Sequence, residues 1–333
     1  MINLSSNAII VKVRARYSKR LSNNDFESLI SCSSVSEIAS VLKNKHNYCD
    51  FLNKISEKDI HRDTLESVLS YSFFEDISIL AKYDSMFGRN VFKYILTKFE
   101  IQQISKFLIF LKSGNAQKFK CVVPSFFRSE SKIKFNSFNE AESYASLLGA
   151  LSRTCYCKIL EPFNTKSMDF DINDIDTRLY NYLFDSLCSS IKKLDRKSKT
   201  ESMKVLYDYV DVSNVIRIVR LKKFYNLDDD YVSRMIFEFG DYKFSKYDDL
   251  IKSNFSDFSF IDNTLRSVRD LEKFSKTLRF KWAKKHIRFS NVSEIVGFSY
   301  VLLKEIEMFN LINIIEGVRY GISKDALRMM IVK

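Results

Sequence analysis

The sequence is poor in the residues that end or bend regular structure. Its 333 residues include only 7 Gly and 2 Pro, too few for the many tight turns of a β-rich fold. This scarcity favours long helices joined by short polar loops. No apolar run approaches the roughly 18 residues needed to cross a bilayer, and we expect no signal peptide, because the first charges follow a short apolar run.

The sequence also lacks the usual signatures of an active site. It contains no P-loop, GxGxxG or HExxH pattern, and its 3 His are scattered. The 6 Cys form no paired CxxC motifs, so we expect them to be thiols of a cytoplasmic protein. Carboxylates could still act as acids or bases. We therefore predict no catalytic residue, no cofactor-binding residue and no metal ligand, and an enzyme is the least favoured interpretation.

Positive charge is in excess. The formal net charge is +12 and hydrophobic residues make up 46%, which together indicate a globular chain with an anionic partner: nucleic acid, lipid head groups or an acidic protein. The basic run LRFKWAKKHIRF (278–289) could be a solvated helix face, a protein or lipid contact, or a nucleic-acid contact. Helical spacing predicts a core stripe on the same helix, made of Leu271, Phe274, Leu278 and Trp282.

One helical motif occurs three times along the chain. The copies are FEIQQISKFLIFLKSG (from Phe99), VDVSNVIRIVRLKKFY (from Val210) and IEMFNLINIIEGVRYG (from Ile306). Each has an acid at its second position, an amide three residues later, and apolar residues at helical spacing; the acids are Glu100, Asp211 and Glu307, and the amides are Gln103, Asn214 and Asn310. We interpret the apolar face as core, and the acids as residues near a helix start that favour its dipole or contact a partner.

A second motif recurs at a nearly fixed distance from the first. Its leading aromatics are Tyr48, Tyr156 and Phe255, and the acids lie 52, 55 and 52 residues downstream (48 to 100, 156 to 211, 255 to 307). The period of roughly 100 residues is longer than the roughly 20–50 of solenoid repeats. It therefore predicts a small helical domain copied twice, with boundaries at 1–115, 116–226 and 227–333.

Local signals place several helix ends. We expect N-caps at Asn24 or Asp25, at Ser34 or Ser36, at Ser137 and at Ser323, and a left-handed helix end at Gly321. Gly317, inside a helix, indicates close helix packing. Residues 116–136 are predicted as a linker with a short extended piece at 120–123, and residues 161–176 as a loop.

The residues of the third copy resemble a known family. VGFSYVLLKEIEMFNLINIIEGVRYGISKDAL (296–327) resembles the end of the C-type subunit of archaeal and bacterial V-type (A/V-type) ATPases, whose eukaryotic equivalent is the d-type subunit. DVSNVIRIVRLKKF and the N-terminal VKVRARYSKRLSNNDFESLI resemble its internal and opening segments. The sequence departs from the family pattern at three points: Gln103 replaces Asn, Tyr225 stands where the other copies have Gly, and a proline expected before Val296 is absent.

The resemblance implies an all-α fold of three similar helical domains, arranged as a funnel around a pseudo-threefold axis. It implies a non-catalytic socket between the ATP-hydrolysing head and the ion-carrying ring, for H⁺ or Na⁺. The implied partners are the proteolipid subunits of the membrane rotor ring and central stalk subunits D and F, with no nucleic acid. The implied location is the cytoplasmic face of the plasma membrane, reached through the ring, and the Lys-rich, Pro-poor composition suggests a bacterial source.

Polar positions on the repeated helix are the candidate partner interface. They are Lys112, Arg217, Arg220, Lys223 and Arg319. Two other functions remain open from the residues themselves. One is a basic helical nucleic-acid-binding protein, which strong salt-dependent retention on nucleic acid would favour; the other is a helical adaptor protein.

Overall fold

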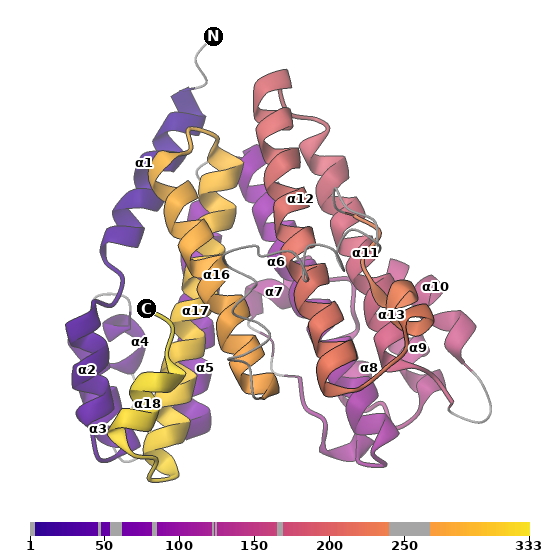
Figure 1. Ribbon diagram of the computed structural model, residues 1–333, viewed down its shortest axis with the longest axis horizontal. Coiled ribbons are helices and arrows are strands. Elements are labelled where there is room, and N and C mark those ends of the chain that lie inside the picture. Colours follow the sequence, from indigo (N-terminus) through magenta and orange to yellow (C-terminus); the bar gives the residue numbers. More distant parts are fainter. Residues whose placement is uncertain are drawn as a thin grey trace. The chain divides into compact units, whose positions relative to one another are not determined.

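A computed structural model describes most of the chain, namely residues 4–45, 48–53, 62–81, 85–121, 123, 125–164, 169–239 and 267–333. Every regular element within these ranges is a helix, which confirms the all-α prediction. The chain divides into two compact units (Figure 1). Unit 1 comprises Met1–Phe92 with Thr264–Lys333, and unit 2 comprises Lys93–Asn263.

Unit 1 joins the two ends of the sequence. Its helices are α1 (Leu4–Ser18), α2 (Asn23–Ser31), α3 (Val35–Lys43), α4 (Cys49–Leu52), α5 (Arg62–Ala81), α16 (Val268–Phe289), α17 (Ser293–Arg319) and α18 (Lys324–Met330). The long helix α6 (Ser85–Lys112) begins in unit 1 and continues into unit 2.

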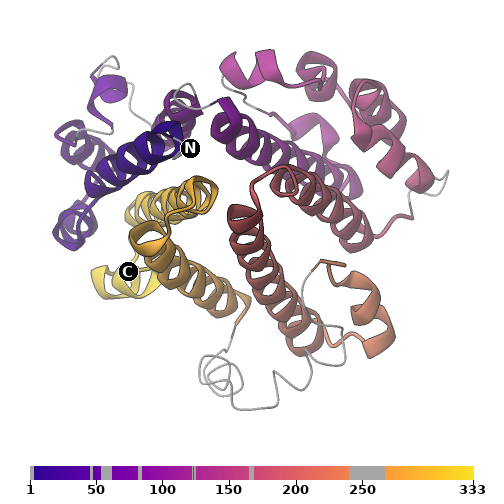
Figure 2. The ribbon, with the colours of Figure 1, turned by 90° about the horizontal axis from the view of Figure 1, so that it is seen from above.

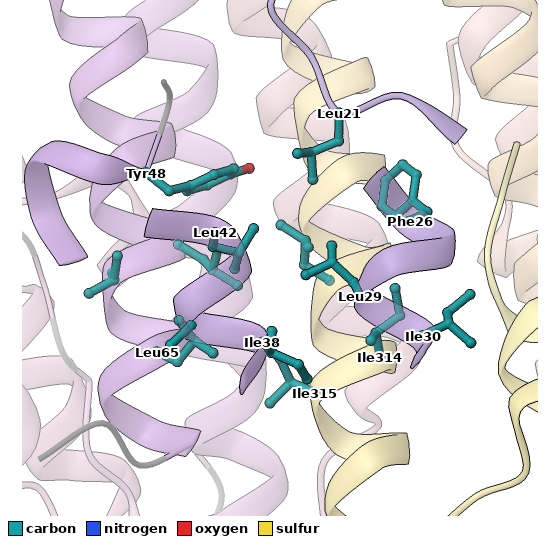
Figure 3. Packing of buried hydrophobic residues seen from close by; sticks show 14 of the residues in the cluster. Leu21, Phe26, Leu29, Ile30, Ile38, Leu42, Tyr48, Leu65, Ile314 and Ile315 are labelled. Atoms are coloured by element: carbon teal, nitrogen blue, oxygen red, sulfur yellow. The ribbon is translucent and has the colours of Figure 1, made fainter. Parts of the chain in front are cut away.

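The core of unit 1 forms around α17. This helix carries the third copy of the motif, and its Leu311, Ile314 and Ile315 are fully buried. They pack with apolar side chains of α2, α3 and α5, including Leu29 and Ile38 (Figure 3). The apolar rhythm of the motif is therefore core, as predicted, and burial of each such side chain contributes about 1.5–3 kcal/mol in transfer terms.

Helix α16 lies beside α17 (Figures 1 and 2). The residues that it buries differ from the predicted stripe. Leu271 is buried as expected, whereas Phe274, Leu278 and Trp282 are only half-buried. The other buried positions of α16 are Ser275, Ala283 and Ile287. Ser275 and Ala283 are small, and small residues let two helix backbones approach closely, so the buried face of α16 is shifted from the large side chains that the sequence pattern favoured.

Unit 2 contains the middle of the chain. After α6 come α7 (Ser125–Glu130), α8 (Phe135–Asn139), α9 (Tyr144–Leu151), α10 (Cys155–Leu160), α11 (Ile172–Ile191), α12 (Arg196–Val219) and α13 (Asp229–Met235). The predicted linker at 116–136 is wrong, because it holds the 3₁₀ turn Ala116–Lys118, α7 and the start of α8, and its described residues form no strand. The predicted loop at 161–176 is also too long, since Asp171 caps α11.

Serine and aspartate caps fix the helix starts. Ser34 and Ser323 accept hydrogen bonds from first-turn amides, as predicted. Helix α2 is capped by Ser22 instead, and Asp25 closes a reciprocal capping box with it. The predicted cap at Ser137 is wrong: Ser137 lies inside α8, and Ser143 caps α9. Two serines precede that apolar run, and the nearer one is the cap.

The three motif helices end in the same left-handed conformation. Gly114 (φ 69°) and Gly321 (φ 66°) lie 14 residues after the acids of copies one and three. In copy two Tyr225 holds that place, and the positive φ moves to Asn226 (φ 51°). The reason is a π-helical turn over Arg220–Phe224, whose wider turn uses one more residue. Asparagine tolerates this conformation better than tyrosine.

Gly317 permits a close contact between α17 and α18. A methyl group at this position would lie 2.0 Å from Leu327 Cδ2, and Leu327 is itself buried. We expect Gly317→Ala to lower the free energy of unfolding, because overpacking costs about 1–3 kcal/mol against a helix-propensity gain of about 1 kcal/mol. Urea denaturation followed by circular dichroism measures the change.

The glycine of α9 supplies the matched control. A methyl group at Gly149 meets no atom within 4 Å. Gly149→Ala should therefore stabilise the protein by about 0.5–1 kcal/mol. Equal effects of the two substitutions would contradict the packing role of Gly317.

Candidate functional site

The three motif acids lie in the interior of long helices. Glu100, Asp211 and Glu307 are each about 15 residues from the start of α6, α12 and α17 (85 to 100, 196 to 211, 293 to 307). All three are less than 10% exposed. The interpretation as first-turn acids is therefore wrong, since the dipole effect is confined to the first turn. The helices extend upstream of the repeated pattern, where the copies no longer resemble one another.

In unit 1, Glu307 is the centre of a buried hydrogen-bond cluster. Its carboxylate accepts from the Tyr48 hydroxyl (2.8 Å), the Lys304 ammonium (2.7 Å) and the backbone N–H of Leu21 (3.1 Å). Lys304 is 4% exposed and also faces the ring of Tyr48. The cluster joins the loop after α1, the residue before α4 and the middle of α17, so its bonds connect residues more than 250 positions apart.

In unit 2, Glu100 occupies a similar setting without a cation. It accepts a hydrogen bond from the Tyr156 hydroxyl (2.6 Å) and another from the Ser131 hydroxyl. The position three residues earlier, which is Lys304 in copy three, is Thr97 here and is also buried. Among the described residues, the donors to Glu100 are therefore neutral.

The two acids respond to burial in opposite directions. Burial opposes ionisation of Glu307, but the charge and hydrogen bond of Lys304, together with the hydrogen bonds from Tyr48 and Leu21, outweigh it and lower the pKa of this carboxyl. Burial prevails at Glu100 and raises its pKa, although Ser131 and Tyr156 oppose the shift. Burial together with the adjacent acid also raises the pKa of Tyr48 and of Tyr156, so both phenols remain protonated and donate.

Each tyrosine contacts an acid from a different copy of the repeat. Tyr156, of copy two, binds Glu100 of copy one, and Tyr48, of copy one, binds Glu307 of copy three. The sequence shows both motifs and their nearly constant separation. That spacing assigns each tyrosine to the same copy as the acid downstream of it, not to the acid that it binds. The same pattern would pair Phe255, of copy three, with Asp211, of copy two, but Phe255 lies outside the described residues.

The motif amides hold a backbone segment that lies further along the chain. Asn310 donates to Val332 O (2.8 Å) and accepts from Val332 N–H (2.8 Å). Asn214 makes the same two bonds with Phe237 (3.1 and 2.8 Å). Both asparagines are almost fully buried. Gln103, the departure in copy one, is exposed to solvent at least in part, so the two-point amide lock occurs where asparagine is present.

The five candidate interface residues have different surroundings. Arg217 donates to Asn173 O (2.9 Å) and Thr177 Oγ1 (2.8 Å), and lies over a phenylalanine ring. Lys112 is exposed along its side chain and donates to Phe170 O (3.1 Å). The remaining three are Arg220, which is half-buried, and Lys223 and Arg319, which are exposed. The exposed members are the ones able to meet a partner without rearrangement of the unit.

Three other features are absent from the described ranges: a metal cluster, a membrane-spanning helix and a disulfide. They contain no group of three or more His, Cys, Asp or Glu side chains placed to hold a metal ion. None of the described helices is long and apolar enough to span a membrane. None of the six cysteines is in a disulfide.

A comparison with known families places the chain. The profile of the ATP synthase (C/AC39) subunit family matches residues 9–330. The chain belongs to this family. The match includes both buried clusters and all three copies of the motif, and it confirms the resemblance seen in the sequence. The all-helical chain is thus assigned to the C/AC39 family. In this chain, Glu100 and Glu307 accept buried hydrogen bonds from tyrosine hydroxyls.

A curated relative supports the same placement. The chain is 25% identical over 239 residues to a protein of Methanosphaera stadtmanae that is named as the C-type subunit of an A-type ATP synthase. The aligned region covers 69% of this C/AC39 chain and 57% of the relative, so the chain spans less than two thirds of the length of that protein.

Proposed function

We propose that this chain is the non-catalytic central-stalk component of a rotary A/V-type ATPase, coupling the stalk of the ATP-hydrolysing head to the membrane rotor ring for H⁺ or Na⁺ transport. The observation that carries the proposal is the family match over residues 9–330. The name of the Methanosphaera relative, which places it in an A-type ATP synthase, agrees with it. The proposed partners are the proteolipid subunits of the ring and stalk subunits D and F.

In this proposal the repeats 1–115, 116–226 and 227–333 are three helical domains of a funnel around a pseudo-threefold axis. The protein lies on the cytoplasmic face of a bacterial plasma membrane and reaches the membrane through the ring. Torque transmission requires a stiff body, and densely packed helices have low compressibility. The buried acid–tyrosine bonds support this requirement, because each ties together segments of different repeats.

The proposed contact residues are basic. Lys112, Lys223 and Arg319 are exposed near the ends of the three motif helices, and Arg217 and Arg220 lie one to two turns earlier in copy two. Basic side chains close to anionic head groups gain about 1 kcal/mol each. Positive charge at these residues therefore favours binding to a ring that is embedded in an anionic membrane.

Affinity capture tests the proposed function. A tagged chain expressed in its own cell and captured from detergent-solubilised membranes should bring down rotor-ring and stalk proteins, identified by mass spectrometry. Lys223→Glu with Arg319→Glu should reduce that recovery, whereas Lys285→Glu with Arg288→Glu on the exposed face of α16 should not. Recovery of unrelated soluble proteins alone would contradict the proposal.

A further inference from the structure

Unit 1 contains a pocket of about 250 Å³ whose charged lining is almost all basic. It lies where the end of α1, the start of α2, the middle of α17 and the last residues meet. One side-chain carboxylate, that of Glu307, reaches it. Five cationic side chains line it, namely Arg16, Arg20, Lys284, Lys304 and Lys333.

Three of these cations already pair with carboxylates inside unit 1. Arg16 forms an ion pair with Asp76, Lys304 pairs with Glu307 at 2.7 Å, and Lys333 pairs with Glu27 at 2.8 Å. The carboxylate in the pocket is therefore compensated by its own lysine and does not oppose an incoming anion.

The other two cations have aromatic neighbours but no carboxylate among the described residues. The guanidinium of Arg20 lies 4.3 Å from the centre of the Tyr17 ring, and the ammonium of Lys284 lies 5.5 Å from that of Phe280. Their charges are thus available on the pocket wall. Lys284 is half-buried, where solvent screens its field less than on an open surface.

Tyr17 adds a donor that lacks an acceptor. Its side chain lines the pocket and is only 9% exposed, and its hydroxyl oxygen makes no hydrogen bond within the described part of the chain. Buried hydroxyls are nearly always bonded. The ring that carries this hydroxyl lies against the Arg20 guanidinium, so an acceptor brought by a ligand would satisfy both groups.

We propose that this pocket binds a phosphate group with two or more negative charges. Arg20, Lys284 and Tyr17 offer donors, and a guanidinium matches the oxygens of phosphate in a two-point geometry. The volume is below the roughly 300–1,000 Å³ of pockets for drug-sized ligands, which favours pyrophosphate or a terminal phosphomonoester over a whole nucleotide. The phosphate could belong to a soluble metabolite or to a phosphomonoester lipid.

Titration calorimetry of the full chain with pyrophosphate at constant ionic strength tests the proposal. Because the chain carries a net charge of +12, the control must remove the same charge elsewhere. Arg20→Gln/Lys284→Gln should weaken binding by at least about tenfold, as expected for lost hydrogen bonds to a charged group. Arg288→Gln/Lys285→Gln, on the exposed face of α16, should change it less than about twofold, within the usual range of surface substitutions.

A second substitution separates recognition from charge. Tyr17→Phe keeps the ring and the net charge, and should weaken pyrophosphate binding by about tenfold with an unchanged circular dichroism spectrum. Equal affinity of both double variants, or no binding of pyrophosphate by the wild-type chain at millimolar concentration together with no binding to the lipid below, would overturn the proposal.

Vesicle binding distinguishes the two sources of phosphate. Vesicles containing phosphatidic acid should retain the wild-type chain more than phosphatidylserine vesicles of equal surface charge if the ligand is a lipid, and Arg20→Gln/Lys284→Gln should abolish the difference. Equal retention on both lipids, with pyrophosphate binding intact, assigns the site to a soluble ligand. Either result supports phosphate recognition by this pocket.

Discussion

Lys304→Met is expected to lower the free energy of unfolding by about 3–5 kcal/mol at neutral pH, the cost of leaving one partner of a buried ion pair alone. Lys304 and Glu307 are 4% and 7% exposed, and the carboxylate keeps only the bonds from Tyr48 and Leu21 when the ammonium is removed. Methionine preserves most of the length of the lysine stem, so the lost charge accounts for most of the effect. Urea denaturation at neutral pH measures it.

The pH dependence gives an internal check on this substitution. The folded-state pKa of Glu307 is lowered from 4.5 in the wild-type chain, so its stabilising contribution is present above the unfolded value and is lost as the pH falls through the folded value. Without Lys304 only the hydrogen bonds from Tyr48 and Leu21 still lower the pKa of Glu307 against burial, so this advantage is reduced and the difference in stability between the two proteins should shrink at acidic pH.

Two comparison variants sharpen the test of Lys304. Glu27→Gln breaks exposed ion pairs with Arg328 and Lys333 and should leave the denaturation midpoint close to that of the wild type. Lys304→Met/Glu307→Leu removes both charges and should recover much of the loss, as for other buried pairs replaced by apolar residues. A small effect of Lys304→Met at neutral pH would contradict the buried cluster.

Asn214→Ala is expected to cost at least about 2 kcal/mol, because each buried backbone group that loses its partner costs about 1–3 kcal/mol. The substitution leaves both the N–H and the C=O of Phe237 without the Asn214 amide. Asn214 is fully buried, so water does not replace these bonds without rearrangement. Thermal and urea denaturation measure the loss.

The control for Asn214 is an exposed asparagine within the same unit. Asn136 lies on α8 and is exposed, so Asn136→Ala should change stability by less than about 0.5 kcal/mol. Similar losses for the two variants would show that the amide lock contributes little.

Much of the helical organisation follows from local sequence. The apolar rhythm of the motif predicts the buried face around Ile314 and Ile315, and Ser34 and Ser323 act as the predicted caps. Gly321 has the predicted left-handed conformation. These features depend on residues within one or two turns of each other, and short-range patterns contain that information.

The roles of the acids and amides could not be obtained in this way. A helical period identifies a buried face but not the segment that covers it, and the partners of Glu307 are 259 and 286 residues away. The motif begins only one residue before the acid because the residues further upstream differ between copies, with Thr97, Asp208 and Lys304 at the same position. Because of that difference, the sequence pattern predicts neither the continuous helix upstream of the acid nor the ion pair between Lys304 and Glu307.

Tyr48 binds Glu307 and Tyr156 binds Glu100, so neither tyrosine binds the motif acid that lies 52 or 55 residues downstream of it. Double-mutant cycles with Tyr48→Phe and Glu307→Gln, and with Tyr156→Phe and Glu100→Gln, measure this coupling directly. We predict interaction energies of about 0.5–3 kcal/mol for both pairs, and less than about 0.5 kcal/mol for Tyr48 with Glu100, which share no hydrogen-bond partner. A larger coupling for Tyr48 with Glu100 than for Tyr48 with Glu307 would contradict the account.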